Sequence, residues 1–311
     1  MKKSTGVAFS VIVPTFNNRR VLSEVLNALE AQVDAPAFEI IVVNDGSKDG
    51  TREFLDARRF RVPAIVCHQD NAGPAAARNQ GISRAQGELV AFLGDDIIPA
   101  STWLAVHWRA QQHFHAIRPC AVIGYTGWHP RVKVTRFLSY INEYGLQFGY
   151  RLIRFPIDLP FNFFYTSNVS LSRSLLARQR FDEGFPYPAW EDAELSYRLK
   201  KNGLTLIYEP TAKAAHDHPT DFRRFADRQE KAGFCAVVFY RRHPELGPFL
   251  GLGPAGPPPV GSFRRRRALT ALIRLLEPLP LSIPTIWEKT LNCYYIQGLH
   301  RGWKAMKAGR G

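Results

Sequence analysis

The feature that most constrains the fold is a regular alternation, over the first hundred residues, of short apolar runs with longer amphipathic segments. The apolar runs are rich in Val, Ile, Leu and Phe and cover residues 9–14, 38–43, 63–68 and 88–93. Helical spacing predicts helices between them, from Arg19 to Ala31, after Ser47 and from Pro74. Continuous apolar strands joined by helical crossovers are typical of a mostly parallel sheet that helices cover on both faces.

Polar residues gather where these predicted strands end. The runs are followed by the segments PTFNN, NDGSKDGT, QDNAGPAAARN and GDDIIP. In an open parallel sheet, ligands bind beyond the carboxyl ends of the strands. The sequence therefore predicts a binding site at one edge of an α/β sheet.

Two adjacent carboxylates, Asp95 and Asp96, directly follow the run at 88–93 and Gly94. One carboxylate would suffice to cap a helix, whereas two like charges side by side repel each other unless a cation relieves them. We therefore interpret the pair as part of a metal or nucleotide site, with a helix cap as the alternative.

Composition narrows the class of protein. The chain has 311 residues, of which 45% are hydrophobic and 22% charged, as expected for a globular protein with one large domain and an appendage. No uninterrupted apolar run is long enough for a simple membrane span, and the N-terminal segment favours a first strand over a signal peptide. The four cysteines are scattered, which favours reduced thiols in a cytosolic protein.

The pattern changes after the first hundred residues. A strand and turn are predicted at 161–173, a helix at 190–203 and a further strand at 204–210. Beyond residue 220 the sequence indicates a basic helix, a Gly/Pro-rich linker at about 247–261 and a basic, apolar tail. We therefore predict a first domain over residues 1–220 and a helical C-terminal region over 221–311.

The net charge of +14 calls for a negatively charged partner, such as nucleic acid, an anionic membrane or a phosphorylated substrate. Much of the excess lies in residues 262–311, where Arg264 to Arg267 precede an apolar segment. This pattern suits adsorption to an anionic membrane surface, and interrupting charges and prolines disfavour a span. A helical appendage packed on the first domain is the alternative.

Five motifs occur in a characteristic order: VIVPTFNN, VVNDGSKDGT, NAGPAAARNQGI, FLGDDIIP and WEDAELSYRLKKNG. Together, over about residues 8–220, they resemble a family 2 glycosyltransferase of the GT-A fold. The resemblance implies transfer of a sugar from a nucleotide-diphosphate donor to an acceptor hydroxyl, with inversion at the anomeric carbon. It also implies a divalent cation, Mn²⁺ or Mg²⁺, and makes residues 1–220 the catalytic domain.

The resemblance assigns the metal site. Asp96 is the implied metal ligand, and Asp95 contacts the ribose or supports the metal site. Gly94 stands where the family often has a first acid, which leaves the division of roles between the two aspartates open. His216 follows the strand at 204–210 and is implied as an additional ligand, with a structural role as the alternative. His218 is the less favoured of the two histidines.

The family's general base matches the Glu191-Asp192 pair. We predict Asp192 as the base that takes the proton of the acceptor hydroxyl and Glu191 as an acceptor-side or positioning residue. Both acids would also favour the first turn of a helix, which is compatible with catalysis. Trp190 either stacks on a sugar ring or packs in the interior, and the sequence does not decide between these.

The resemblance also predicts a donor site at the strand ends. The residues expected to bind the donor nucleotide are Pro14, Thr15, Asn44, Asp45, Arg78 and Asp95. Asn168 matches a family segment near the donor sugar and the acceptor. Turn formation is the alternative for Asn168, and turn formation with helix capping is the alternative for the NDGSKDGT segment.

No Q-x-x-R-W segment follows Asp192, which favours single additions over processive synthesis. The predicted function is therefore non-processive transfer from a UDP-sugar to a glycan or lipid-linked acceptor, in the assembly of cell-surface polysaccharide or glycolipid. We expect a cytoplasmic protein, peripheral on the inner face of the cell membrane. A non-catalytic nucleotide-sugar binding protein of the same fold is the alternative; nucleic-acid binding is not expected, because only the net charge favours it.

Overall fold

The computed structural model describes residues 6–115, 117–218, 220–259, 268–273 and 283–309. The chain divides into two compact units. Unit 1 consists of Met1–Val132, Ile153–Glu183 and Asp192–His218, and unit 2 of Lys133–Leu152, Gly184–Glu191 and Pro219–Gly311.

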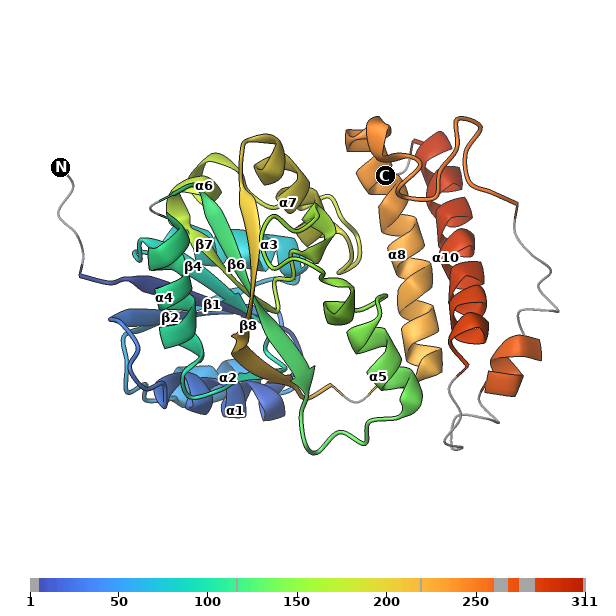
Figure 1. The fold of residues 1–311 in the computed structure, drawn as a ribbon. Coiled ribbons are helices and arrows are strands. Elements are labelled where there is room, and N and C mark those ends of the chain that lie inside the picture. The colour runs from blue at the N-terminus through green and yellow to red at the C-terminus, as the bar shows by residue number, and fades with distance from the viewer. Residues whose placement is uncertain (1–5, 116, 219, 260–267, 274–282, 310–311) are drawn as a thin grey trace. The chain divides into compact units, whose positions relative to one another are not determined.

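Unit 1 is built on a mixed sheet, which has eight strands in the described part of the chain, in the order β3-β2-β1-β4-β7-β6-β8-β5 (Figure 1). The strands are β1 (Phe9–Thr15), β2 (Phe38–Asp45), β3 (Ala64–Gln69), β4 (Leu89–Leu93), β5 (Ile97–Pro99), β6 (Cys120–Trp128), β7 (Asn168–Ser172) and β8 (Thr205–His216). The first four pair in parallel, as do β6 and β8, whereas β7 is antiparallel to β4 and β6, and β5 to β8. The predicted α/β class with a mostly parallel sheet is confirmed.

Helices cover both faces of this sheet. They are α1 (Arg19–Glu30), α2 (Thr51–Ala57), α3 (Pro74–Arg84), α4 (Trp103–His115), α6 (Arg173–Arg178) and α7 (Glu191–Lys201). Side chains alternate along β1, so Val11 and Val13 join one hydrophobic cluster with α1 and α4, while Ile12 joins the other with α3, α6 and α7. Gly81 allows α3 to approach the sheet closely, because a Cβ there would lie 2.5 Å from Ile12 Cγ2.

Two predicted segments differ from the structure in detail. The segment 161–173 begins with a short 3₁₀ helix, η2 (Phe161–Phe163), and becomes a strand only at β7. The other 3₁₀ helices in the described chain are η1 (Tyr150–Leu152) and η3 (Pro244–Leu246). The strand predicted at 204–210 continues to His216, with a register shift at Gly124/Tyr125 of its partner β6.

Unit 2 contains α5 (Arg136–Glu143), α8 (Phe222–Arg242) and α10 (Pro284–Lys307). Helices α8 and α10 lie side by side (Figure 1), and glycines bring their backbones into contact. A Cβ on Gly233 would lie 2.0 Å from the carbonyl oxygen of Tyr295, and one on Gly298 would lie 1.9 Å from that of Glu230. The predicted helical C-terminal region is therefore present.

The Gly/Pro-rich segment that follows α8 packs on α10. Leu250 and Leu252 are buried, the Tyr295 hydroxyl donates to the Leu250 carbonyl at 3.1 Å, and His300 Nε2 lies 2.7 Å from the Pro258 carbonyl oxygen. Arg264 to Arg267 lie outside the described residues, so membrane adsorption stays a prediction, as does the boundary at residue 220. Among the helices that the structure describes, none combines the length and apolarity of a membrane span.

Candidate active site

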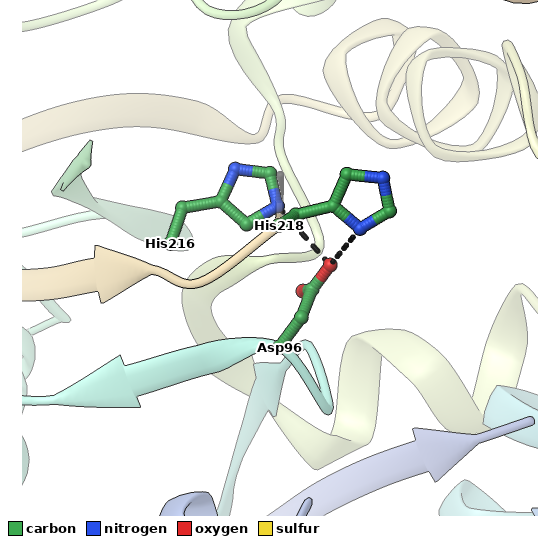
Figure 2. Close-up of side chains that lie close together, drawn as sticks. All are labelled: Asp96, His216 and His218. Carbon is green, nitrogen blue, oxygen red and sulfur yellow. Dashed lines mark hydrogen bonds and ion pairs between the residues drawn. The ribbon is translucent and has the colours of Figure 1, made fainter. Parts of the chain in front are cut away.

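Three potential metal ligands from distant parts of the sequence meet at one edge of the sheet (Figure 2). Asp96 Oδ2 lies 3.1 Å from His216 Nε2 and 3.2 Å from His218 Nδ1. The ligand atoms of all three residues lie within 4.8 Å of one another. The sequence predicts Asp96 and His216 as ligands, and the structure adds His218, the less favoured of the two histidines.

Strand pairing explains why these residues meet. The short strand β5 directly follows Asp96 and pairs antiparallel with the end of β8, with Ile97 opposite His216. The Asp217 N–H then donates to the Asp96 carbonyl at 2.8 Å. On the other side of β8, the ring of Trp128 stacks on His216 with centroids 5.3 Å apart and planes 9° apart, which fixes the plane of the imidazole.

The two aspartates differ in their electrostatics. Burial, and then the neighbouring charge of Asp96, raise the pKa of Asp95 to about 7. Burial would also raise the pKa of Asp96, but the positive charge and hydrogen bonds of His216 and His218 outweigh it and hold that pKa below its usual range. Asp96 is therefore the more acidic residue of the pair.

The chemistry of this donor set fits a divalent cation. One carboxylate oxygen and two imidazole nitrogens converge from three different points of the backbone. Imidazole and carboxylate together suit first-row metals such as Mn²⁺, while Mg²⁺ prefers oxygen ligands. The residues present could therefore hold the cation that the sequence motifs imply.

Gly94 has a steric reason for being glycine. A Cβ at this position would lie 2.8 Å from Ile97 Cγ1 and 2.9 Å from Asp96 Oδ1. An acid here, as in the usual family motif, would have to displace both neighbours. The turn between β4 and β5 is therefore built around two carboxylates.

Thr15 and Asp95, both predicted to bind the nucleotide, lie together at the ends of β1 and β4. The Thr15 hydroxyl donates to Asp95 Oδ2 at 2.7 Å, and the Phe16 N–H donates to the same oxygen at 3.3 Å. Asn18 Nδ2 donates to the Asp95 carbonyl at 3.1 Å. Pro14 precedes Thr15 in β1, opposite Val43 in β2.

Asn44 and Asp45, at the end of β2, are buried and serve the neighbouring loops. The Asp45 carboxylate accepts from the backbone N–H groups of Ala72 at 2.8 Å and Gly73 at 2.9 Å, which fixes the entry to α3. Asn44 Oδ1 accepts from the Ser47 N–H at 3.0 Å. These contacts fit the turn-forming alternative, and nucleotide binding by the two residues stays a prediction.

Arg78 lies on α3 and is partly buried. Its guanidinium carbon lies 5.4 Å from the centroid of the Phe181 ring, within the range of a cation–π interaction. The predicted contact between Arg78 and the donor stays a prediction.

Asn168 is the first residue of β7 and lies in the interior of unit 1. It is fully buried, and its Oδ1 accepts from Trp103 Nε1 at 2.8 Å and His107 Nε2 at 2.9 Å. Its Nδ2 donates to the carbonyls of Tyr125 at 3.2 Å and Ala212 at 3.0 Å. The amide is thus hydrogen-bonded within the interior of the sheet, and the predicted contact of Asn168 with the donor sugar or the acceptor stays a prediction.

Helix α7 begins with the predicted acidic pair. Glu191 is buried, and Asp192 is partly buried, with its Oδ1 accepting from the Ala193 N–H at 2.8 Å. The first turn of a helix stabilises negative charge through the aligned peptide dipoles. The position therefore suits a carboxylate, and the catalytic roles of both residues stay predictions.

Trp190 precedes α7 with a φ of 72°, an uncommon value for a bulky residue. Its Nε1 donates to the Ala232 carbonyl at 3.0 Å, and its ring centroid lies 6.0 Å from those of Phe239 and Phe249. Of the two alternatives left open by the sequence, these contacts support packing within unit 2.

Comparison with solved structures identifies the fold. The mannosyltransferase PcManGT from Pyrobaculum calidifontis, in complex with GDP-Man and Mn²⁺, has a TM-score of 0.64 at 20% identity, over 95% of this chain and 86% of that one. Residues 1–349 of S. aureus TarS, in complex with UDP, have a TM-score of 0.52 at 18% identity, over 97% and 92% of the two chains. These similarities show the GT-A fold of glycosyltransferases, as predicted.

Sequence comparison identifies the family. The profile of "Glycosyl transferase family 2" matches residues 10–178, and the chain belongs to this family. A relative, validoxylamine A glucosyltransferase from Streptomyces hygroscopicus subsp. limoneus, is 28% identical over 274 residues. That match covers 78% of this chain and 58% of the relative, so the chain spans less than two thirds of that protein.

Proposed function

We propose that this glycosyltransferase uses a nucleotide-diphosphate sugar, with a UDP-sugar favoured, and transfers the sugar to an acceptor hydroxyl with inversion. The observation that carries the proposal is the convergence of Asp96, His216 and His218 at the sheet edge. It is supported by family membership and by two proteins of the same fold, one solved with GDP-Man and Mn²⁺ and the other with UDP.

Asp96, His216 and His218 would hold Mn²⁺ or Mg²⁺. When bound, the cation would stabilise the negative charge that develops on the leaving diphosphate. Thr15 and Asp95, already joined by a hydrogen bond, would contact the ribose of the donor. Pro14, Asn44, Asp45 and Arg78 would complete the nucleotide site.

Asp192 would act as the general base. In a single displacement, the acceptor oxygen attacks the anomeric carbon from the face opposite the diphosphate, so the configuration inverts. The proton of the acceptor hydroxyl passes to the Asp192 carboxylate as the new glycosidic bond forms and the bond to the diphosphate breaks. Glu191 would orient the acceptor.

The acceptor would be a glycan or a lipid-linked sugar in cell-surface polysaccharide or glycolipid assembly, extended by one sugar at a time. The basic C-terminal residues 262–311 would hold the protein to the inner face of the cell membrane, where such acceptors lie. Sedimentation with anionic vesicles, with and without replacement of Arg264 to Arg267 by glutamine, tests this part separately. Equal recovery of the two chains would contradict tail anchoring.

The main test is a panel of nucleotide sugars with Mn²⁺ or Mg²⁺, scored by thermal shift and by release of the nucleotide. We expect one donor to stabilise the protein in the presence of the metal and to be hydrolysed slowly. Asp192→Asn should keep donor binding and lose nucleotide release. Binding without release in the wild type would favour the non-catalytic alternative, and no response to any donor would overturn the proposal.

A further inference from the structure

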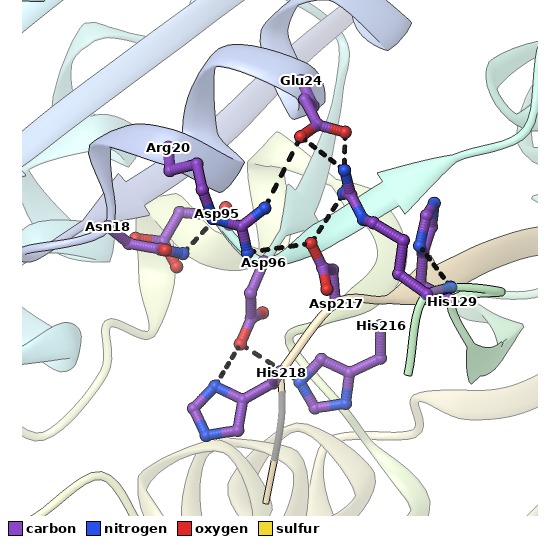
Figure 3. A network of polar contacts seen from close by, with 10 residues as sticks. Asn18, Arg20, Glu24, Asp95, Asp96, His129, His216, Asp217 and His218 are labelled. Carbon is purple, nitrogen blue, oxygen red and sulfur yellow. Dashed lines mark hydrogen bonds and ion pairs between the residues drawn. The ribbon is translucent and has the colours of Figure 1, made fainter. Parts of the chain in front are cut away.

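Asp217 lies between the two histidines of the metal site and points away from them (Figure 3). Side chains of successive residues in extended backbone alternate between opposite sides. His216 and His218 therefore face Asp96 together, and the Asp217 carboxylate faces the other way. Its side chain is only 3% exposed, so this carboxylate is a buried negative charge beside the site.

Two arginines from elsewhere in unit 1 hold this carboxylate. Asp217 Oδ2 lies 2.7 Å from Arg131 Nη2 and 3.2 Å from Arg20 Nη2. Arg131 precedes unit 2 in the chain, and Arg20 lies in the first turn of α1. The carboxylate is therefore fixed from two independent backbone segments.

A second acid keeps the two arginines in place. The Glu24 carboxylate accepts two hydrogen bonds from Arg131: Nη1 donates to Oε1 at 2.9 Å, and Nη2 donates to Oε2 at 2.7 Å. Arg20 Nη1 lies 3.7 Å from Glu24 Oε1. This bidentate geometry is the strongest arrangement of a guanidinium with a carboxylate. The two positive and two negative charges balance, so the buried charge of Asp217 is compensated where it lies.

The backbone on either side of Asp217 is fixed as well. The Asp217 N–H donates to the Asp96 carbonyl at 2.8 Å, and the His129 N–H donates to the His216 carbonyl at 3.0 Å. Together, these bonds and the ion pairs determine the direction in which the two imidazoles leave the backbone.

We propose that Asp217 is a positioning residue for the metal site: held by Arg131 and Arg20, it fixes the direction of His216 and His218. The inference rests on the proposed function, because it concerns the affinity of the same three ligands for the cation. Removing the Asp217 charge deletes no ligand. Residues that orient metal ligands typically contribute about 10- to 100-fold in metal affinity.

The test measures the Mn²⁺ affinity of the donor-free 311-residue chain by the electron paramagnetic resonance signal of free Mn²⁺, together with the unfolding midpoint in urea. The variants are Asp217→Asn and Arg131→Lys, which keeps the charge but loses the planar fork. The matched control is Glu30→Gln, which breaks the largely buried ion pair of Glu30 Oε2 and Arg58 Nη2, 2.9 Å long, on the same helix as Arg20.

We expect Asp217→Asn to weaken Mn²⁺ binding by about 10- to 100-fold and Arg131→Lys by less. Glu30→Gln should lower the unfolding midpoint and leave Mn²⁺ affinity unchanged. In turnover assays, Asp217→Asn should raise the Mn²⁺ concentration for half-maximal rate more than it lowers the rate at saturating Mn²⁺.

Three results would overturn the inference. Wild-type affinity in Asp217→Asn would do so, as would an equal loss of affinity in Glu30→Gln, since the effect would then follow from general destabilisation. Absence of Mn²⁺ binding in the wild type would remove the proposed metal site as well, which distinguishes the two failures. If Asp217→Asn does not fold, Arg131→Lys decides, because the Arg131 side chain is 43% exposed and tolerates change.

Discussion

Replacing Asn168 with alanine distinguishes an interior role from a sugar contact. The substitution removes the acceptor for two fully buried donors, Trp103 Nε1 and His107 Nε2, and the donor to two carbonyls. A buried donor without a partner costs about 1 to 3 kcal/mol, so the two together predict a loss of about 2 to 6 kcal/mol in the free energy of unfolding.

Urea unfolding of Asn168→Ala, followed by tryptophan fluorescence, measures this loss. Asn202→Ala is the control, because Asn202 is exposed and its Nδ2 donates to the Arg198 carbonyl at 2.8 Å. Its free energy of unfolding should change by less than about 0.5 kcal/mol. A stable Asn168→Ala protein with an increased KM for the donor would refute this reasoning and would support a contact between Asn168 and the donor sugar.

Three further predictions follow from buried contacts. Burial lowers the pKa of His107 from its ordinary 6.5 to about 4. The contribution of the neutral imidazole to the free energy of unfolding is therefore complete above pH 6.5 and is lost as the pH falls to 4. The pKa shift is worth about 3 kcal/mol in the free energy of unfolding. His107→Gln should therefore make that free energy fall less steeply between pH 6.5 and 4. An unchanged dependence on pH would argue against a neutral His107. Gly94→Ala should reduce stability by about 1 to 3 kcal/mol and weaken Mn²⁺ binding, measured by calorimetry, because the methyl group crowds Ile97 and Asp96; unchanged affinity would contradict this. Gly298→Ala should lower the melting temperature more than Gly302→Ala, because its Cβ would lie 1.9 Å from the Glu230 carbonyl oxygen, against 2.8 Å from that of Phe234; the reverse order would refute the close contact of the helices.

The first half of the sheet could be predicted because its signals are local. The apolar runs at 9–14, 38–43, 63–68 and 88–93 correspond to β1–β4 within about two residues, since each is bounded by turn-forming residues. The place of β7 between β4 and β6 could not be predicted, because strand order depends on contacts between residues far apart in the sequence.

The candidate site shows the same difference between features with a local sequence signal and features that depend on distant residues. Asp96 and His216 each follow a predicted strand, and ligands bind beyond the carboxyl ends of strands in such sheets. The sequence therefore predicts both residues at the same edge of the sheet. His218 could have been found from the His-Asp-His alternation, since residues two apart share a side in extended backbone. The burial of Asn168 depends on Trp103 and His107, on a helix some sixty residues away, and no local pattern indicates it.

Because the side chains of His216, Asp217 and His218 alternate between two sides, this segment is sensitive to the insertion or deletion of a single residue. Deleting one residue just before it, or inserting one, would exchange the two sides, turning the carboxylate toward Asp96 and the imidazoles toward Arg20 and Arg131. Two negative charges would then face each other where a cation is expected, while the guanidinium groups of Arg20 and Arg131 would lose Asp217 and keep Glu24 as an acidic partner. Changes of chain length just before His216 should therefore preserve the site only in steps of two.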